Sequence, residues 1–244
     1  MKKVQIALFL TSFLLLVFGS CHKEDDILPA NAKLRQVLVF NNLTETTPVD
    51  TVEEYEYING QISKVILQYA YNTYEYNTSG QLIKVTNYNA NLNSPTGYIV
   101  LKIYSYQYSD DGKKTKETIG YPMINSSEYN LFSYTDGRLS KVENYGNSNT
   151  LVNYTVYEYD NSGQLIKEVI YDQNDMPYRW TINTFSNGLM IKTEIYADEN
   201  LENKVRELKR TFDANKNLKI LETYQGPYSS AVGNFVYRYV YFGE

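Results

Sequence analysis

The sequence predicts an all-β protein, a large antiparallel meander of about sixteen strands built from hairpin repeats and curled on itself. Three observations predict it. A phrase of alternating aromatic and β-branched residues returns seven times, and each turn inside it is made of Asn, Asp, Ser and Gly. The third observation is the high tyrosine content: the chain has 26 tyrosines against 9 phenylalanines and 1 tryptophan. Tyrosine favours strands and half-buried faces, where its ring packs and its hydroxyl stays in water.

The first twenty residues predict a signal peptide. Lys2 and Lys3 precede a mostly apolar run over 4–18, which is shorter than the roughly 20 residues that a spanning helix needs. The sequence Gly19-Ser20-Cys21 resembles the lipobox of bacterial lipoproteins, although Phe18 stands where leucine is usual. That resemblance implies cleavage before Cys21 and acylation of its thiol, with an ordinary signal-peptidase site as the alternative. Cys21 is the single cysteine, and a lone thiol in an exported protein needs such an explanation.

Residues 21–31 are expected to form an acylated, flexible tether. The run 22–26 is similar to the acidic export tag of Bacteroidetes-type lipoproteins, and a plain solvated tether is the other interpretation. We therefore expect a lipid-anchored protein of the outer membrane, displayed at the cell surface. The sequence leaves open which leaflet carries the lipid.

Residues 32–244 are expected to form one domain. Cleavage leaves 224 residues with 21 basic and 28 acidic side chains, a formal charge of −7, and there is no basic stretch. Nucleic acid is excluded as a partner, because binding phosphates needs clustered Lys and Arg. With no cysteine left to pair, stability has to come from packing.

The repeated phrase can be aligned on its turn glycines, which are separated by 20, 32, 25, 26 and 25 residues. The copies cover 55–64, 74–84, 106–116, 132–141, 157–167 and 185–192, and a degraded copy follows at 212–218. Each copy predicts a β-hairpin. Asn-Gly and Asp-Gly suit a two-residue turn, and Ser-Gly suits a three-residue turn that ends in a left-handed glycine. Counting outward from the first turn predicts Tyr57 opposite Ile62 and Tyr55 opposite Lys64.

A lysine follows four residues after every turn glycine, which suggests two interpretations. The lysines could form a ladder that binds an anionic ligand, or each could be the cross-strand partner of a tyrosine ring or a glutamate. We favour the second interpretation. The six residues are Lys64, Lys84, Lys116, Lys141, Lys167 and Lys192.

Two phrases carry a family resemblance. Tyr157-Glu-Tyr159-Asp160-Asn-Ser-Gly163 and Tyr134-Thr-Asp136-Gly137 resemble YD repeats, the tyrosine-aspartate units of RHS-type proteins. The similarity covers about residues 50–225. Large RHS proteins use such units to build a shell, for which this chain is too short. It is more similar to small uncharacterised Bacteroidetes lipoproteins with YD-like hairpins alone, and this resemblance implies a barrel-like or porin-like sheet and supplies no catalytic residues.

The two ends of the domain favour closure of the sheet. Residues 33–40 resemble the second strand of a hairpin repeat, and residues 235–241 resemble the first strand. Pairing these two segments would complete a repeat and would leave the sheet without an exposed strand edge. Closure into a barrel is the hypothesis, and an open twisted sheet is the alternative. The expected strands of about eight residues fall below the 9–11 needed to cross a membrane, so the acyl chain is expected to hold the membrane.

No catalytic constellation is found, so we expect no enzyme, no metal site and no cofactor. The single histidine, His22, lies in the tether, which rules out a zinc site or a histidine-dependent triad. Glu56, Glu75 and Glu158 are the carboxylates that could flank a sugar, but their equivalent repeat positions favour cross-strand or solvent-facing roles. The weak candidates for ligand stacking are Trp180, Tyr178 and Tyr121, with ordinary packing as the favoured alternative.

The expected function is a binding or scaffolding module for a glycan, a peptide or a partner protein. A structural envelope component is the alternative, and a carboxylate-based glycan hydrolase is the least favoured one. The sequence leaves the ligand and the oligomeric state open.

Overall fold

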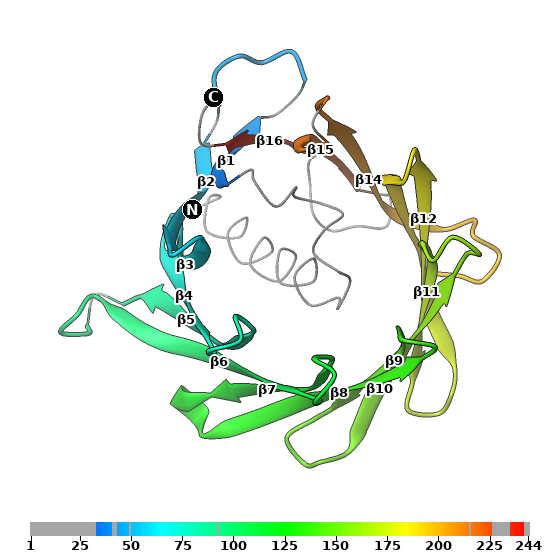
Figure 1. Ribbon diagram of the computed structural model, residues 1–244, viewed down its shortest axis with the longest axis horizontal. Coiled ribbons are helices and arrows are strands. Elements are labelled where there is room, and N and C mark those ends of the chain that lie inside the picture. Colours follow the sequence, from blue (N-terminus) through cyan, green and yellow to red (C-terminus); the bar gives the residue numbers. More distant parts are fainter. Residues whose placement is uncertain are drawn as a thin grey trace.

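The protein is a closed barrel of sixteen antiparallel strands, in which every strand pairs with its neighbours in chain order (Figure 1). The computed structural model describes residues 33–40, 43–48, 50–91, 93–214, 216–225 and 235–241. The predicted signal peptide, Cys21 and the tether lie outside the described residues. The strands are β1 Leu34–Phe40, β2 Asp50–Ile58, β3 Gln61–Leu67, β4 Ala70–Tyr76, β5 Leu82–Ala90, β6 Tyr98–Tyr108, β7 Lys114–Tyr121, β8 Ser126–Thr135, β9 Arg138–Tyr145, β10 Leu151–Tyr159, β11 Leu165–Asp172, β12 Pro177–Ser186, β13 Leu189–Tyr196, β14 Lys204–Phe212, β15 Leu218–Gln225 and β16 Phe235–Tyr241.

The terminal strands close the barrel, which confirms the prediction made from the two terminal segments. β1 pairs with β16, and Val37 lies opposite Tyr239. This pairing leaves no unpaired strand edge in the described sheet. A 3₁₀ turn, η2 (Pro122–Ile124), lies between β7 and β8, and the described part of the chain has no helix long and apolar enough to cross a membrane.

The predicted hairpins are present, but the register prediction is only half right. Tyr57 lies opposite Ile62 as expected, whereas Tyr55 lies opposite Val65 and not opposite Lys64. The cause is a β-bulge after Glu56, which places an extra residue in the second strand and shifts the pairing by one. The same bulge recurs after Glu75 in β4, so the repeat lysines lie opposite glutamates: Lys64 opposite Glu56 and Lys84 opposite Glu75.

Side chains alternate between a buried face and an exposed face of the sheet. In β2, Glu53 and Tyr55 are buried while Glu54 and Glu56 are exposed. The tyrosines of the repeated phrase share the buried face. Tyr55 pairs with Val65 and Val65 pairs with Asn72, so Asn72, and with it Tyr74 two residues later, lies on the same face as Tyr55. This constant facing is what the repeat predicts.

Arg238 identifies the exposed face as the outside of the barrel. Tyr239 pairs with Val37, and Val37 pairs with the buried Glu53, so these three residues share the buried face. Because neighbouring residues in a strand point to opposite faces, Arg238 lies on the exposed face. Its guanidinium donates to the carbonyls of Leu43 (2.9 Å) and Glu45 (2.8 Å). Figure 1 shows that segment, in light blue, outside the ring of strands. The tyrosine-bearing face is therefore the inner wall.

The inner wall is tied together by tyrosine hydroxyls that bond to the preceding unit. Each hydroxyl donates to a carbonyl at or beside the start of that unit's second strand, at 2.6–2.9 Å. The bonds run from Tyr57 to Leu34, Tyr108 to Leu82, Tyr134 to Lys114, Tyr159 to Leu139 and Tyr241 to Leu218. Phe185 has no hydroxyl at this position, and Asn183 on the same strand donates to the Leu165 carbonyl instead (3.1 Å).

The two ends of the barrel are built from different turns. We call one end the glycine rim, which is formed by the described residues of the turns 59–60, 77–81, 109–113, 136–137, 160–164, 187–188 and 213–217. We call the other end the distal rim, which is formed by the described residues of the connections 43–48, 68–69, 91–97, 122–125, 146–150, 173–176 and 197–203. Leu34 pairs with Tyr241 at the glycine rim, so the chain enters the barrel there.

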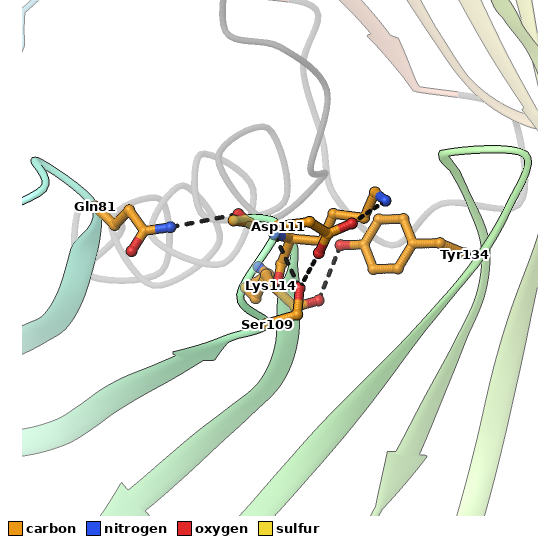
Figure 2. Close-up of polar contacts among 7 residues, drawn as sticks. Gln81, Ser109, Asp111, Lys114 and Tyr134 are labelled. Atoms are coloured by element: carbon orange, nitrogen blue, oxygen red, sulfur yellow. Dashed lines mark hydrogen bonds and ion pairs between the residues drawn. The ribbon is translucent and has the colours of Figure 1, made fainter.

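Turns of the glycine rim contact one another. The Gln61 side chain donates to the Gly80 carbonyl (3.0 Å), and the Gln81 side chain donates to the Gly112 carbonyl (3.4 Å). Figure 2 shows the second contact, with the Tyr134 ring reaching the same turn from the next hairpin. These bonds join three successive turns of the glycine rim.

Candidate binding site

The repeat lysines lie on the outer face, and each contacts a glutamate or a tyrosine ring. The contact crosses to the neighbouring strand for five of them, whereas Lys192 pairs with Glu194 of its own strand. Lys84, Lys141, Lys167 and Lys192 form ion pairs of 2.8–3.2 Å. Lys64 and Lys116 lie 4.7 and 4.5 Å from the centres of the rings of Tyr71 and Tyr129. Four of the six charges are thus paired with a glutamate along the outer wall, which favours cross-strand and neighbouring contacts over an anion-binding ladder.

The three repeat glutamates also lie on the outer face. Glu75 and Glu158 are the partners of Lys84 and Lys167, and about half of each glutamate side chain is exposed (52% and 51%). Glu56 is exposed in β2. They occupy three separate hairpins, so their arrangement is that of a solvated ladder. The absence of enzymatic activity stays a prediction.

The structure separates the three candidates for stacking. Trp180 is buried on the outer face of β12, in register with Val169 (6% and 4% exposed). Tyr178 is exposed (42%) near the distal rim of the same strand. Tyr121 ends β7 on the inner wall, five strands away. Of the three, Tyr121 is the one that lies at the mouth of the barrel.

Tyr121 belongs to a polar cluster on the inner wall beside the distal rim. Its hydroxyl donates to Glu128 (3.1 Å), and the Lys102 ammonium lies 5.3 Å from the centre of its ring. Burial, with the bond to Glu128, raises the pKa of the Tyr121 hydroxyl. On the neighbouring strands, Asn87 donates to Asn72 at 2.6 Å. A shallow hollow of about 260 Å³ opens beside Tyr121 and is lined by Gly120, Pro122, Asn125, Ser126 and Ser127.

A row of three asparagines continues the polar wall on β8, β9 and β10. Asn130 lies opposite Asn144, and Asn144 lies opposite Asn153. We call these residues the asparagine row. Glu117 on β7 lies opposite Asn130 and accepts its side-chain N–H at 3.4 Å. The Oδ1 atom of Asn144 is buried and has no hydrogen-bond partner among the described residues.

The inner wall changes character towards the glycine rim. There, leucines at the start of the second strands are buried, with Leu139 and Leu165 at 3% and 4% exposure. Lys114 takes the same position in its unit, lies 4.3 Å from the centre of the Phe132 ring, and forms an ion pair with Glu117 (3.4 Å). The barrel therefore has an apolar, hydroxyl-tied inner wall at one end and an amide-lined wall at the other.

Two carboxyl groups of the inner wall are strongly perturbed. Burial raises the pKa of Glu53 to about 7, against the opposing effect of a hydrogen bond from the Tyr55 hydroxyl. Burial likewise raises the pKa of Glu168 to about 7, and a hydrogen bond with Asn183 opposes the shift. They lie on different hairpins, β2 and β11. Nothing pairs them as acid and base, and the described residues contain no cluster of His, Cys, Asp or Glu suited to a metal ion.

Five of the seven described connections of the distal rim contain an exposed large apolar side chain, and at 91–97 and 146–150 such a side chain lies just inside the next strand. The turns of the glycine rim contain none, and Ile58, Ile83 and Ile166 are exposed on the strands beside them. On the distal rim the exposed fractions range from 39% for Tyr98 to 72% for Ile124, and the set is Leu43, Tyr69, Tyr98, Met123, Ile124, Val152, Met176 and Leu201. Four successive connections, 68–69, 91–97, 122–125 and 146–150, contain no charged residue. We call these four connections the uncharged arc. The glycine-rim turns consist of small, polar and charged residues.

The sequence interpretation missed the asparagine row. One signal existed: an asparagine two residues before the aromatic of the phrase, as in Asn72-x-Tyr74, Asn130-x-Phe132 and Asn183-x-Phe185, shares its face in a strand. The register that aligns Asn130, Asn144 and Asn153 across three strands could not be read from that spacing.

Comparison with known proteins shows the fold alone. No protein-family model matches the chain, and no curated protein sequence matches it. A porin-like protein from Bacteroides vulgatus is similar in structure, with a TM-score of 0.51 at 11% identity over 87% of this chain and 100% of that chain. A porin-like protein from Bacteroides uniformis gives a TM-score of 0.43 at 9% identity, over 85% and 96%. The TcdB2–TccC3 complex gives 0.22 at 12% identity, over 73% of this chain and 12% of that chain. The resemblance to YD repeats stays a prediction from the sequence.

Proposed function

We propose that this chain is a lipid-anchored protein of the outer membrane, displayed at the cell surface, whose barrel stands outside the bilayer and binds a partner through its distal rim. The contrast between the two rims carries the proposal. The short turns of the glycine rim contain no exposed large apolar side chain and contact one another at two places, while five of the seven described distal connections expose such a side chain. Binding residues are found disproportionately on loops held by a rigid scaffold.

The outer wall supports a position outside the bilayer. It carries the ion pairs of Lys84 with Glu75 and of Lys167 with Glu158. The strands have 7–11 residues, so several are longer than the eight that the sequence predicts and reach the length that crosses a membrane; the support comes from the charges and not from strand length. A lysine or arginine on the lipid face of a barrel costs about 2–4 kcal/mol at the bilayer midplane, so a wall with repeated charges is unsuited to lipid.

The place where the chain enters supports outward display of the distal rim. β1 begins with Leu34 at the glycine rim, and twelve residues separate Leu34 from Cys21. A lipid on Cys21 would therefore hold the barrel by its glycine rim and leave the distal rim facing away. We expect Cys21→Ser to release the protein from membranes, measured by fractionation and by incorporation of a labelled fatty acid. Continued membrane attachment of that variant would contradict the anchor.

A photo-crosslinking experiment tests the distal rim as the binding surface. Benzoylphenylalanine is introduced at Met123 on the distal rim or, as the matched control, at Asn161 on the glycine rim, and whole cells are irradiated. We expect a discrete adduct from position 123 and none from position 161. Equal adducts from both positions, or none from either, would overturn the proposal, and the second outcome would favour the structural envelope role.

A further inference from the structure

We infer that the asparagine row is a binding track for a neutral oligosaccharide that enters through the uncharged arc of the distal rim. The inference rests on the proposed function and names its ligand class. Asn130, Asn144 and Asn153 lie side by side on the inner wall of β8–β10, and two of their strands are joined by the connection 146–150 of the arc.

The position of the row makes it reachable from the distal rim. Asn144 is the last residue but one of β9, and Asn153 is the third residue of β10. Asn130 is the fifth residue of β8, whose hairpin with β7 extends beyond the end of β9, and it lies level with Asn144 in the sheet. The row spans roughly 10 Å, which is two strand spacings and comparable with a disaccharide.

The chemistry of the row fits a ligand with many hydroxyl groups. Each carboxamide presents a donor and an acceptor side by side, which matches neighbouring hydroxyls on a sugar ring. The buried Oδ1 of Asn144 has no hydrogen-bond partner among the described residues, and buried polar atoms in native proteins nearly always have one. A ligand hydroxyl at the centre of the row would supply that donor.

The charges around the row favour a neutral ligand. Glu117, opposite Asn130, is paired with Lys114 at 3.4 Å, so the two charges offset each other. Two further carboxylates lie beside the row and would repel an acidic ligand: Asp172 lies opposite Asn153, and Glu128 precedes Asn130 by two residues on the same face of β8. The uncharged arc adds Asn, Ser, Thr and Tyr residues and no charge that would steer an ionic ligand. An acidic polysaccharide would gain nothing from these surroundings.

The closed sheet argues against an extended peptide in the same place. Peptides that bind β-proteins as an added strand need an unpaired strand edge. The described barrel has none, because β1 and β16 pair. A peptide at the row would therefore be limited to side-chain contacts, whereas a sugar uses the carboxamides directly.

The test measures sugar binding to the purified full chain. An array of neutral α-glucan, β-glucan, mannan, xylan and galactan oligosaccharides is probed beside polygalacturonate and heparin fragments, and the best neutral ligand is titrated by calorimetry. We expect neutral binding, weakened about tenfold by Asn144→Leu and by Asn153→Ala. Asn161→Ala, in an exposed turn of the glycine rim, is the matched control and should leave the affinity unchanged. Circular dichroism checks that each variant is folded.

A label on the sugar makes the test independent of the variants. A photoreactive derivative of the bound oligosaccharide should modify the unsubstituted chain within residues 126–159. No neutral binding, binding of the acidic fragments alone, undiminished affinity in both variants, or labelling elsewhere would each overturn the inference. An adduct from position 123 without any sugar binding would overturn it while leaving the proposed function intact.

Discussion

The glycine rim and the distal rim are ends of the same sixteen strands, yet they differ in almost every chemical respect. Glycine-rim turns hold glycines at positive φ, from 79° to 87° in Gly60, Gly80, Gly112, Gly137, Gly163 and Gly188. Among the distal connections that the structure describes throughout, the length varies from two residues at 68–69 to seven at 197–203. The spacing between turn glycines is unequal in part because these distal connections differ in length. The repeat therefore constrains one end of the barrel and leaves the other end able to carry specificity.

The largest effect is expected from pH, acting on the inner wall between the rims. Burial raises the pKa of Glu53 and of Glu168 from 4.5 to about 7, so the folded state favours the protonated carboxyls. Their stabilisation is complete below pH 4.5 and is lost as the pH rises through about 7, at most about 3 kcal/mol each. We expect a higher melting temperature at pH 5.5 than at pH 8.

Glu53→Gln should remove its share of that pH dependence, because an amide does not titrate. Glu75→Gln on the outer face, where the side chain is 52% exposed, is the matched control and should leave the pH profile unchanged. A pH profile that is identical in all three proteins would show that the inner carboxyls are hydrated.

The next largest effect concerns the turn at Gly137. Its φ of +79° lies in the left-handed region, and nothing lies within 4 Å of a Cβ added there, so any cost is backbone strain alone. Gly137→Val should destabilise the protein by about 2 kcal/mol in denaturant unfolding. Gly120→Ala, where the added Cβ meets the Ile103 carbonyl at an ordinary 3.7 Å, should change stability by less than about 0.5 kcal/mol. Similar losses in both variants would remove the special role of the glycine rim.

A smaller effect is expected from the hydroxyls that tie the units together. Tyr159→Phe removes the bond to the Leu139 carbonyl (2.9 Å) and should cost about 1 kcal/mol. Tyr88→Phe is the control, since the Tyr88 hydroxyl on the outer face has no hydrogen-bond partner in the described structure and its ring stays stacked on Tyr71. Chemical denaturation of the two variants measures the difference. A loss as large in Tyr88→Phe would mean that the hydroxyl bond contributes nothing specific.

The smallest effect on stability is expected at the distal rim. Met123 and Ile124 are 64% and 72% exposed, so replacing both by serine should change the free energy of unfolding by less than about 0.5 kcal/mol. The same double variant should weaken capture of the partner from a neighbouring crosslinking position such as Val152. Unfolding of this variant would show that the rim serves stability rather than binding.

Much of the fold could be predicted from the sequence because hairpins are local. The turn residues Asn59-Gly60 and Asp136-Gly137 dictate a reversal at positive φ, which the structure confirms at 52° and 87° and at 51° and 79°. Alternation then fixes which residues share a face, and the two terminal segments indicated closure. The bulge after Glu56 escaped prediction, because the turn sequence alone does not say on which strand an extra residue is accommodated.

The candidate site was much less predictable. Tyr121 was named from its place near a loop, and the structure puts it at the inner mouth with Lys102 and Glu128. Trp180, named for the same reason, is buried on the outer face. Exposure of an aromatic ring depends on what the neighbouring strands place beside it, and this is not a property of the ring's own segment.

The order of residues along the chain is enough to determine the hairpins, their turns and the common facing of the tyrosines, since each depends on contacts between residues close in sequence. The closed sheet alone decides which face becomes the inner wall and which asparagines become neighbours. Asn130, Asn144 and Asn153 belong to three strands, and their alignment follows from the register and bulges of every pairing around the barrel. A binding surface made of side chains from several strands is therefore a property of the assembled sheet.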